Sequence, residues 1–231
     1  MEPQDHAEPG NTPAAQRLAA FWGDLETHLT VGTAPGAAEG LARWAAARGL
    51  GFTHIVLARG RHRSQPMVTL RGRGRADEWT AGPVARIAGL LAEEGFTVLR
   101  TKTESAPWAT GVPVTDAQAR LAPAHLHFEH HVKLLVDPGR DPASLAARLG
   151  GHTAHVSWNA RRVRDDGRHE RFVTQRCHGV GRTTAGRRLD ALLAALSDEP
   201  GIRILEHERE YVLHDSRLGL DAGWITEGTA S

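Results

Sequence analysis

The chain has 231 residues, of which 40% are hydrophobic and 24% are charged, and its formal net charge is +1. This composition indicates a globular protein rather than a disordered one, and so small a net charge is not that of a dedicated nucleic-acid-binding protein. The single cysteine, Cys177, excludes an internal disulfide, and no apolar run approaches the about 20 residues that a membrane-spanning helix requires. The polar N-terminal segment lacks the basic and then apolar order of a secretory signal, so we expect a cytoplasmic protein.

The first half of the chain predicts strands and helices in the order βαββαβ. Residues 1–24 are expected to form a tail followed by a helix, whose apolar spacing runs over 13–25. Alternating residues, turn residues and Ala-rich or Leu-rich stretches then predict the following elements in chain order: strand 26–31, helix 37–48, strand 52–59, strand 65–71, helix 77–94 and strand 96–103.

The same order returns after a connector over residues 105–126. The expected elements are strand 128–136, helix 142–149, strand 152–162, strand 169–177, helix 183–196 and strand 202–212. Residues 216–231 are expected to form a tail that docks through Leu218, Leu220 and Trp224.

Three short matches in the same order indicate that the two halves are copies of one unit. Residues 26–30 (ETHLT) match 129–133 (EHHVK), 53–55 (THI) match 154–156 (AHV), and 68–71 (VTLR) match 173–176 (VTQR). We therefore predict an α+β protein made of two tandem ferredoxin-like modules, over residues 25–104 and 127–215.

The alternation of side chains along each strand separates an apolar set from a polar set. The apolar set, which includes Phe128, Val132 and Cys177, is expected to face the helices. The polar set is expected on the open face of each sheet: Glu26, His28, Thr30, His54, Thr69 and Arg71 in the first module, and Glu129, His131, Lys133, His155, Ser157, Asn159, Arg161, Phe172, Thr174 and Arg176 in the second.

Two arrangements of these open faces are compatible with the pattern. Each face is either solvated, as on many sheets, or packed against the other as in dimeric α+β barrels, which would enclose the polar residues in a cavity. Buried polar groups need partners, so such a cavity would hold water or a ligand.

The residue types favour acid–base chemistry on a small anion that carries a phosphate or a carboxylate. His131 and His155 are the predicted acid and base because histidine titrates near neutral pH, and Glu129 is predicted to orient them. The predicted ligand-binding residues offer cations, an amide and hydroxyl or imidazole groups: Lys133, Asn159, Arg161, Thr174, Arg176, His28 and Arg71. The residue types do not distinguish between a hydrolase, a phosphoesterase and a lyase.

Three other interpretations compete with this one. Glu129, His131 and His155 form a two-histidine, one-carboxylate set that suits a divalent metal. The basic hairpin over residues 159–172 suits RNA or a protein partner, although Phe172 is its one clear aromatic on the open face. The third interpretation is a face that only packs against other parts of the chain and binds no ligand. The oligomeric state stays open.

Two strand segments resemble the His-x-Thr/Ser pattern of the 2H phosphoesterases. They are His28-Leu29-Thr30-Val31 and His155-Val156-Ser157-Trp158, eight residues in all. The resemblance implies that His28 and His155 act as acid and base on a phosphodiester while the hydroxyls hold the phosphate. The sequence departs from that family because one segment is on the first strand of its module and the other is on the second.

Overall fold

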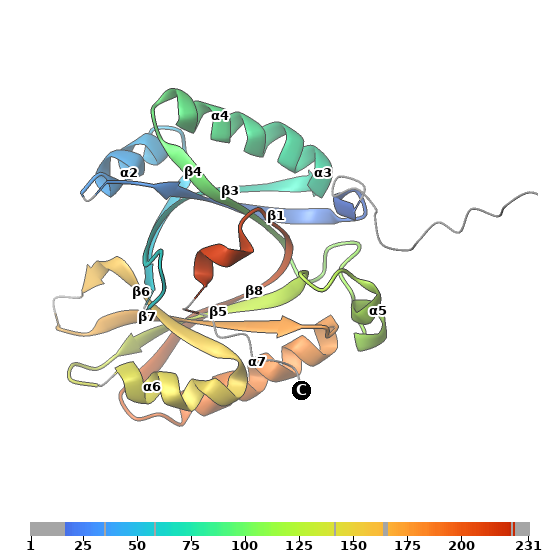
Figure 1. The fold of residues 1–231 in the computed structure, drawn as a ribbon. Helices are drawn as coiled ribbons and strands as arrows, with labels where there is room; N and C mark the ends of the chain where they lie inside the picture. The colour runs from blue at the N-terminus through green and yellow to red at the C-terminus, as the bar shows by residue number, and fades with distance from the viewer. Residues whose placement is uncertain are drawn as a thin grey trace, which may run out of the picture.

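The computed structural model describes residues 17–224 apart from 35, 58, 141, 164, 165 and 223, and it leaves out the side chains of 142, 143 and 158–163. Eight strands close into a barrel in the order β1-β3-β2-β6-β7-β5-β8-β4 (Figure 1). The strands are β1 (Trp22–Gly32), β2 (Gly51–Leu57), β3 (Ser64–Arg75), β4 (Thr97–Ser105), β5 (His127–Val136), β6 (Ala154–Val163), β7 (His169–His178) and β8 (Ile202–Asp215).

Every pairing in the barrel is antiparallel, and two of them join the halves of the chain. β2 pairs with β6, where Val56 lies opposite Trp158, and β4 pairs with β8, where Ser105 lies opposite Tyr211. These two pairings, over residues 55–57 of β2 and 102–105 of β4, join the outer strands of one four-stranded half to those of the other and close the barrel.

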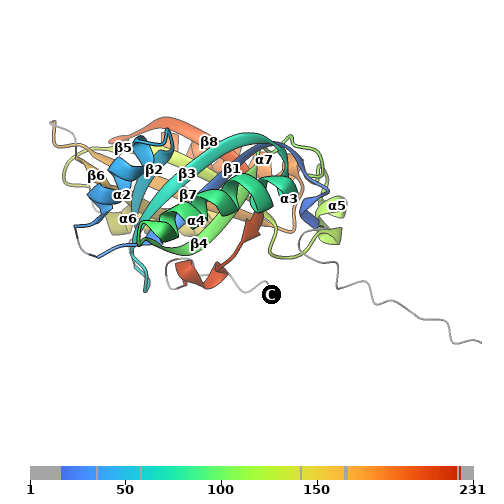
Figure 2. The same ribbon diagram turned by 90° about the horizontal axis from the view of Figure 1, so that it is seen from above.

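The helices lie on the outside of the barrel, in two groups (Figures 1 and 2). α2 (Ala38–Ala46), α3 (Ala76–Trp79) and α4 (Ala85–Glu93) cover the first four strands. α6 (Pro142–Leu149) and α7 (Arg182–Ser197) cover the other four, and the connector holds α5 (Asp116–Leu121). The α+β class predicted from the sequence is therefore confirmed.

Alternate apolar residues of the strands form two cores beneath these helices. In the first core the partners of α2 and α4 are Leu29, Val31, Val68 and Leu70. In the second, the partners of α6 and α7 are Val132, Leu134, Val156 and Val173. Because side chains of a strand alternate, these contacts turn the other residues of β1, β3, β5 and β7 toward the barrel interior.

A third apolar cluster packs along one side of the barrel and contains residues from both halves of the chain. Phe128 and Tyr211 meet there with ring centroids 4.7 Å apart, and burial raises the pKa of Tyr211 to about 12. Cys177 is fully buried in this cluster, as its place in the helix-facing set predicts.

Three expectations from the sequence are corrected by the structure. β1 begins at Trp22, so residues 22–25 are extended rather than helical, because they pair with the end of β3 as far as Arg75. The helix expected over 77–94 is divided by a π-helical turn, Thr80–Val84, at Pro83, which has no N–H to donate.

His54 lies on the outer face of the barrel rather than on the inner one. Phe52 pairs with Val68 beneath the helices, and His54 shares its face, next to Ser64. Ile55 and Leu57 therefore turn inward. The alternation of side chains gave the wrong inner face for β2, because apolar residues occur on both faces of this strand.

The chain after β8 turns back over one end of the barrel, through the 3-10 turn η3 (Leu218–Asp221). Leu220 and Trp224 are buried, whereas Leu218 is 54% exposed, so docking uses two of the three predicted residues. No helix in the described part of the chain has the length and apolar character needed to cross a lipid bilayer.

Candidate functional site

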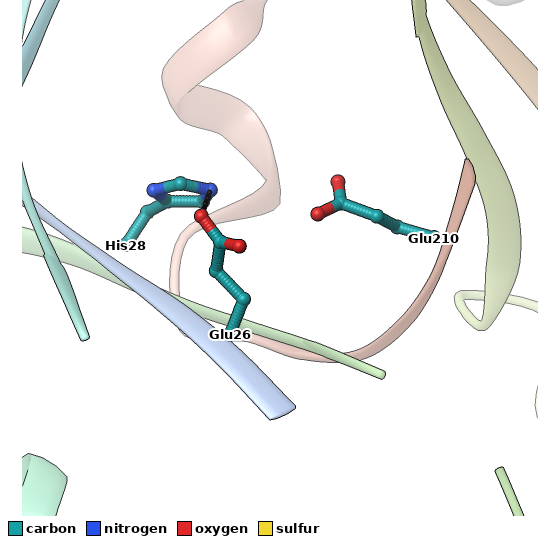
Figure 3. Close-up of side chains that lie close together, drawn as sticks. All are labelled: Glu26, His28 and Glu210. Atoms are coloured by element: carbon teal, nitrogen blue, oxygen red, sulfur yellow. Dashed lines mark ion pairs between the residues drawn. The ribbon is translucent and has the colours of Figure 1, made fainter. Parts of the chain in front are cut away.

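Charged and imidazole side chains from four neighbouring strands meet inside the barrel. Strand register places Glu26 opposite Glu104, His28 opposite Lys102, and Glu129 opposite Glu210 on β1, β4, β5 and β8. Figure 3 shows Glu26 and His28 on β1 and Glu210 on β8 projecting into the same space. We call the seven residues that meet here the central cluster: Glu26, His28, Lys102, Glu104, Glu129, His131 and Glu210.

His28 is held by one hydroxyl and faces two carboxylates. Its Nδ1 is 2.9 Å from Thr69 Oγ1, while its Nε2 is 3.4 Å from Glu26 Oε1 and 3.5 Å from Glu104 Oε2. Burial lowers the pKa of His28 to about 4 and outweighs the nearby carboxylates, so the ring is neutral at pH 7.

His131 has the same arrangement in the second half of the chain. Its Nδ1 is 3.1 Å from Thr174 Oγ1, and its Nε2 is 3.2 Å from Glu129 Oε1 and 3.4 Å from Glu210 Oε2. Burial alone would lower its pKa, but the nearby carboxylates of Glu129 and Glu210 raise the pKa to about 10.

Two arginines hold one glutamate each in matching positions. Arg71 donates to both carboxylate oxygens of Glu26, at 2.7 and 2.9 Å, and Arg176 Nε donates to Glu129 Oε2 at 2.7 Å. His127 adds a contact to Glu129, with its Nε2 3.3 Å from Oε2. These arginines are therefore already neutralised by carboxylates of the chain.

Lys102 lies between two glutamates from different halves. Its Nζ is 2.6 Å from Glu104 Oε1 and 2.5 Å from Glu129 Oε1. Burial would lower the pKa of Lys102, but these two carboxylates raise it, so the ammonium stays charged.

Glu104 and Glu210 are the least satisfied acids of the cluster. Glu104 is 0% exposed, and neither of its carboxylate oxygens makes a hydrogen bond to a described residue; Oε1 lies 2.6 Å from the Lys102 ammonium and Oε2 lies 3.5 Å from His28 Nε2. Glu210 Oε2 also lacks a hydrogen bond within the described chain. Burial and the charge of Glu210 raise the pKa of Glu104 to about 8, although the ammonium of Lys102 opposes this shift.

These atoms form two overlapping groups with the geometry of a metal site. Glu26, His28 and Glu210 are one group, and Glu104, His131 and Glu210 are the other; the ligand atoms of each lie within 4.8 Å of one another. Both groups use the carboxylate of Glu210. Imidazole together with carboxylates is a donor set that suits zinc, iron, manganese or nickel.

A second charged network lies under the C-terminal turn η3. Asp221 Oδ2 accepts from Arg176 Nη2 at 2.8 Å and from Arg100 Nη1 at 3.1 Å, while Asp221 Oδ1 accepts from Gln65 Nε2 at 3.2 Å. Arg100 also binds Asp215 through two hydrogen bonds. Arg176 therefore connects this network to the central cluster through Glu129.

The structure places most of the predicted site residues inside the barrel, but it does not bring all of them together in one cluster. Glu129, His131, Thr174, Arg176, His28 and Arg71 lie in or beside the central cluster. His155 is in neither metal group: its ring lies 5.8 Å from that of Trp224. Lys133 pairs instead with Glu206 at 2.9 Å and with Glu170 at 3.8 Å. The side chains of Asn159 and Arg161 are outside the described part of the chain, so their role and that of the basic hairpin stay predictions.

The sequence reasoning missed Lys102, Glu104, Glu210, Arg100 and Asp221. The first four are on the last strand of each half, which was not sorted by alternation. Charged residues do alternate there, at Arg100, Lys102 and Glu104 in β4 and at Glu206, Glu208 and Glu210 in β8. The same sorting, applied to β4, would have found its inward positions; in β8 it would not separate the two faces, because His207 and Arg209 alternate with the glutamates.

Comparisons with known proteins do not assign the chain to a family. No family model matches, and no curated protein matches. Among solved structures, a putative glycine cleavage system transcriptional repressor is 10% identical and covers 82% of this chain and 97% of its own, with a TM-score of 0.25. The chlorite dismutase of Candidatus Nitrospira defluvii with imidazole is 12% identical, covering 85% and 94%, with a TM-score of 0.28.

An anthrone oxidase-like protein is also similar, at 12% identity over 85% of this chain and 92% of its own, with a TM-score of 0.26. TM-scores and identities this low carry no argument about activity, substrate or cofactor. The residues of the barrel interior must therefore support any functional conclusion by themselves.

The raised pKa values predict that the metal-free protein loses stability at alkaline pH. A group with a raised folded-state pKa stabilises the fold below its unfolded-state pKa, and this contribution falls as pH rises through the folded-state value. For His131 the range is from 6.5 to about 10, and for Glu104 from 4.5 to about 8. With a chelator present, we expect the melting temperature to fall by about 5 °C or more between pH 7 and pH 10.

The variant His131→Gln is expected to show a clearly shallower decline over the same range, since it lacks the imidazolium. Circular dichroism melts at half-unit pH steps measure both slopes. Equal slopes for wild type and variant would show that His131 does not carry the effect.

Proposed function

We propose that the barrel interior binds one divalent metal cation and that the protein is an enzyme that uses this cation. The observation that carries the proposal is the convergence of two groups, each with one histidine and two glutamates, on the shared carboxylate of Glu210. Of the two, we favour Glu104, His131 and Glu210 as the ligands, because Arg71 occupies both oxygens of Glu26.

The charge of the central cluster suits a cation better than an anion. Arg71, Arg176 and Lys102 each contact carboxylates already, while Glu104 and Glu210 retain oxygens that make no hydrogen bond within the described residues. An anion would lie beside these acids. A divalent cation would instead replace the protons that Glu104 and His131 hold at neutral pH, with no change in net charge.

Two features favour a catalytic metal over a structural one. Each group supplies three protein ligands, which leaves coordination positions for water or substrate, as in catalytic zinc sites. The side chains of His131 and His28 are 24% and 19% exposed, so solvent reaches the cluster. A cation there would polarise a substrate oxygen or lower the pKa of a bound water, which serves a hydrolase, a phosphoesterase or a lyase.

We also propose that the halves are tandem ferredoxin-like modules that pack as a pseudo-dimeric α+β barrel. The support is that contacts repeat in pairs: His28 with Thr69 and His131 with Thr174, Glu26 with Arg71 and Glu129 with Arg176. Residues 26, 28, 69 and 71 are the ones that the sequence matches relate to 129, 131, 174 and 176. Two copies of one unit explain why the ligands come in pairs.

A second candidate is metal-free acid–base catalysis by His28 and His131. The opposite pKa shifts favour it, since neutral His28 would be the base and protonated His131 the acid. This modifies the histidine pair predicted from the sequence, in which His155 was the partner of His131.

Calorimetric titration with Zn²⁺ and Mn²⁺ tests the metal proposal. We expect Glu210→Gln to weaken binding by at least about tenfold, because the amide removes the shared anionic ligand. Glu208→Gln is the matched control, since Glu208 is an exposed inward-facing neighbour two residues away and belongs to neither group. Enhanced proton relaxation of water by bound Mn²⁺ would then show the open coordination position.

Two results would contradict the metal proposal: no binding of either cation by the wild-type protein, or an equal loss in Glu208→Gln and Glu210→Gln. Either one would leave the metal-free histidine pair as the better candidate.

A further inference from the structure

We infer that the end of the barrel beneath η3 contains a binding site for a small carboxylate, and that Asp221 of the chain's own C-terminal segment occupies it. Figure 1 shows η3 over the centre of the ring of strands, and Figure 2 shows it at one end of the barrel. The inference does not depend on the metal proposal, because its contacts are made by other side chains.

The Asp221 carboxylate is bound as a ligand would be. Three side chains from three strands donate to it: Gln65 from β3, Arg100 from β4 and Arg176 from β7. Arg100 Nη1 reaches both oxygens, at 3.1 and 3.2 Å. The carboxylate is almost fully buried, so these charge-assisted bonds are shielded from water.

The donors are fixed independently of Asp221, which makes the site preformed. Arg100 is held by Asp215, Arg176 is held by Glu129, and all three donors project from strands of the closed barrel. Asp221 comes instead from a short segment outside the sheet, in which Leu220 and Trp224 are also buried. A free carboxylate would meet the same donors without having to build them.

The same segment covers His155, which the sequence predicts as an acid–base residue. The indole Nε1 of Trp224 donates to Val156 O at 3.1 Å, and its ring lies against that of His155. Burial lowers the pKa of His155, so the ring is neutral, and its one N–H can donate a hydrogen bond to a bound carboxylate. Movement of the segment would uncover His155 and Arg176 together.

The shape of the Asp221 side chain indicates which class of ligand the site would bind. A planar carboxylate on a short apolar stem matches the Asp side chain, so acetate and propionate are the probes. Phosphate carries more charge and a tetrahedral shape, and it would stand close to Asp215 and Glu129; we expect it to bind less well.

Chemical rescue of Asp221→Ala in the full chain tests the inference. With a chelator present and ionic strength held constant, the variant should melt below wild type, and acetate at 50 mM or less should raise its melting temperature at least about 3 °C more than that of wild type. Asp24→Ala is the control, because it also removes a carboxylate from an arginine, Arg73, but at an exposed position. It should respond to acetate as wild type does.

Hydrogen exchange on the wild-type protein gives a second readout that needs no variant. Acetate that competes with Asp221 should speed amide exchange in residues 216–222 and leave the strands unchanged. Equal acetate responses in Asp221→Ala and Asp24→Ala would overturn the inference, and so would stronger rescue by phosphate than by acetate. If Asp221→Ala does not fold, exchange in residues 216–222 that acetate leaves unchanged would overturn it as well.

Discussion

Lys102→Met is expected to destabilise the metal-free protein by about 3–5 kcal/mol, because it removes the buried ammonium that Glu104 and Glu129 share. The Lys102 ammonium lies 2.6 Å from Glu104 and 2.5 Å from Glu129, and all three side chains are buried. Methionine keeps the length of the side chain and removes the charge. Urea unfolding monitored by circular dichroism gives the loss directly.

Lys133→Met is the matched control for this variant. Lys133 lies 2.9 Å from the largely exposed Glu206 and 3.8 Å from the buried Glu170, so its loss should cost less than that of Lys102, about 1–2 kcal/mol. Zn²⁺ should restore most of the stability of Lys102→Met, since a cation among Glu104, His131 and Glu210 replaces the missing charge. Similar losses in the two variants would show that Lys102 does not hold the central cluster together.

Arg100→Met is the second substitution with a large expected effect. It leaves Asp215 without a guanidinium partner and removes one of the three donors to Asp221, deep under η3. We expect a loss of about 3–5 kcal/mol and a melting temperature about 10 °C lower. We also expect faster proteolysis beyond residue 216, because the C-terminal segment loses part of its attachment.

The control is Arg73→Met, which breaks the exposed ion pair of Arg73 with Asp24. Such surface pairs contribute about 0–1 kcal/mol, so its melting temperature should stay within about 3 °C of wild type. The double variant Arg100→Met, Asp215→Leu should recover part of the loss, since it removes the carboxylate left unpaired. No recovery would mean that the loss comes from packing of the Arg100 side chain rather than from charge.

Much of the fold could be predicted from residue patterns. Alternation in segments such as 26–31 and 128–136 predicted the strands, and the matched segments predicted which positions would be equivalent. The outcome for 22–25 and for His54 shows the limit of this reasoning. Trp22–Leu25 form a strand because they pair with β3, and Leu57 faces inward where β2 pairs with β6. Both contacts are with distant parts of the chain, so local residue patterns do not predict them.

The candidate site could be predicted only in part. Glu129, His131, Thr174 and Arg176 were identified because alternation separates them from Val132 and Val173, and that separation is local. Their partners were not identified, because Lys102 and Glu104 lie 25 or more residues from Glu129 along the chain and reach it only across the barrel. Arg176 was predicted to bind an external anion, whereas in the structure it binds Glu129 and Asp221.

In β1, β3, β5 and β7 the sequence by itself determined which side chains face away from the helices, because the period of a strand is two residues and apolar groups avoid water. The tertiary structure decided what those side chains meet. Closure of the barrel brings carboxylates from both halves around His28 and His131, and the C-terminal turn brings Asp221 to the arginines. Burial and charge across that interior, rather than residue type, then lower the pKa of His28 to about 4 and raise that of His131 to about 10.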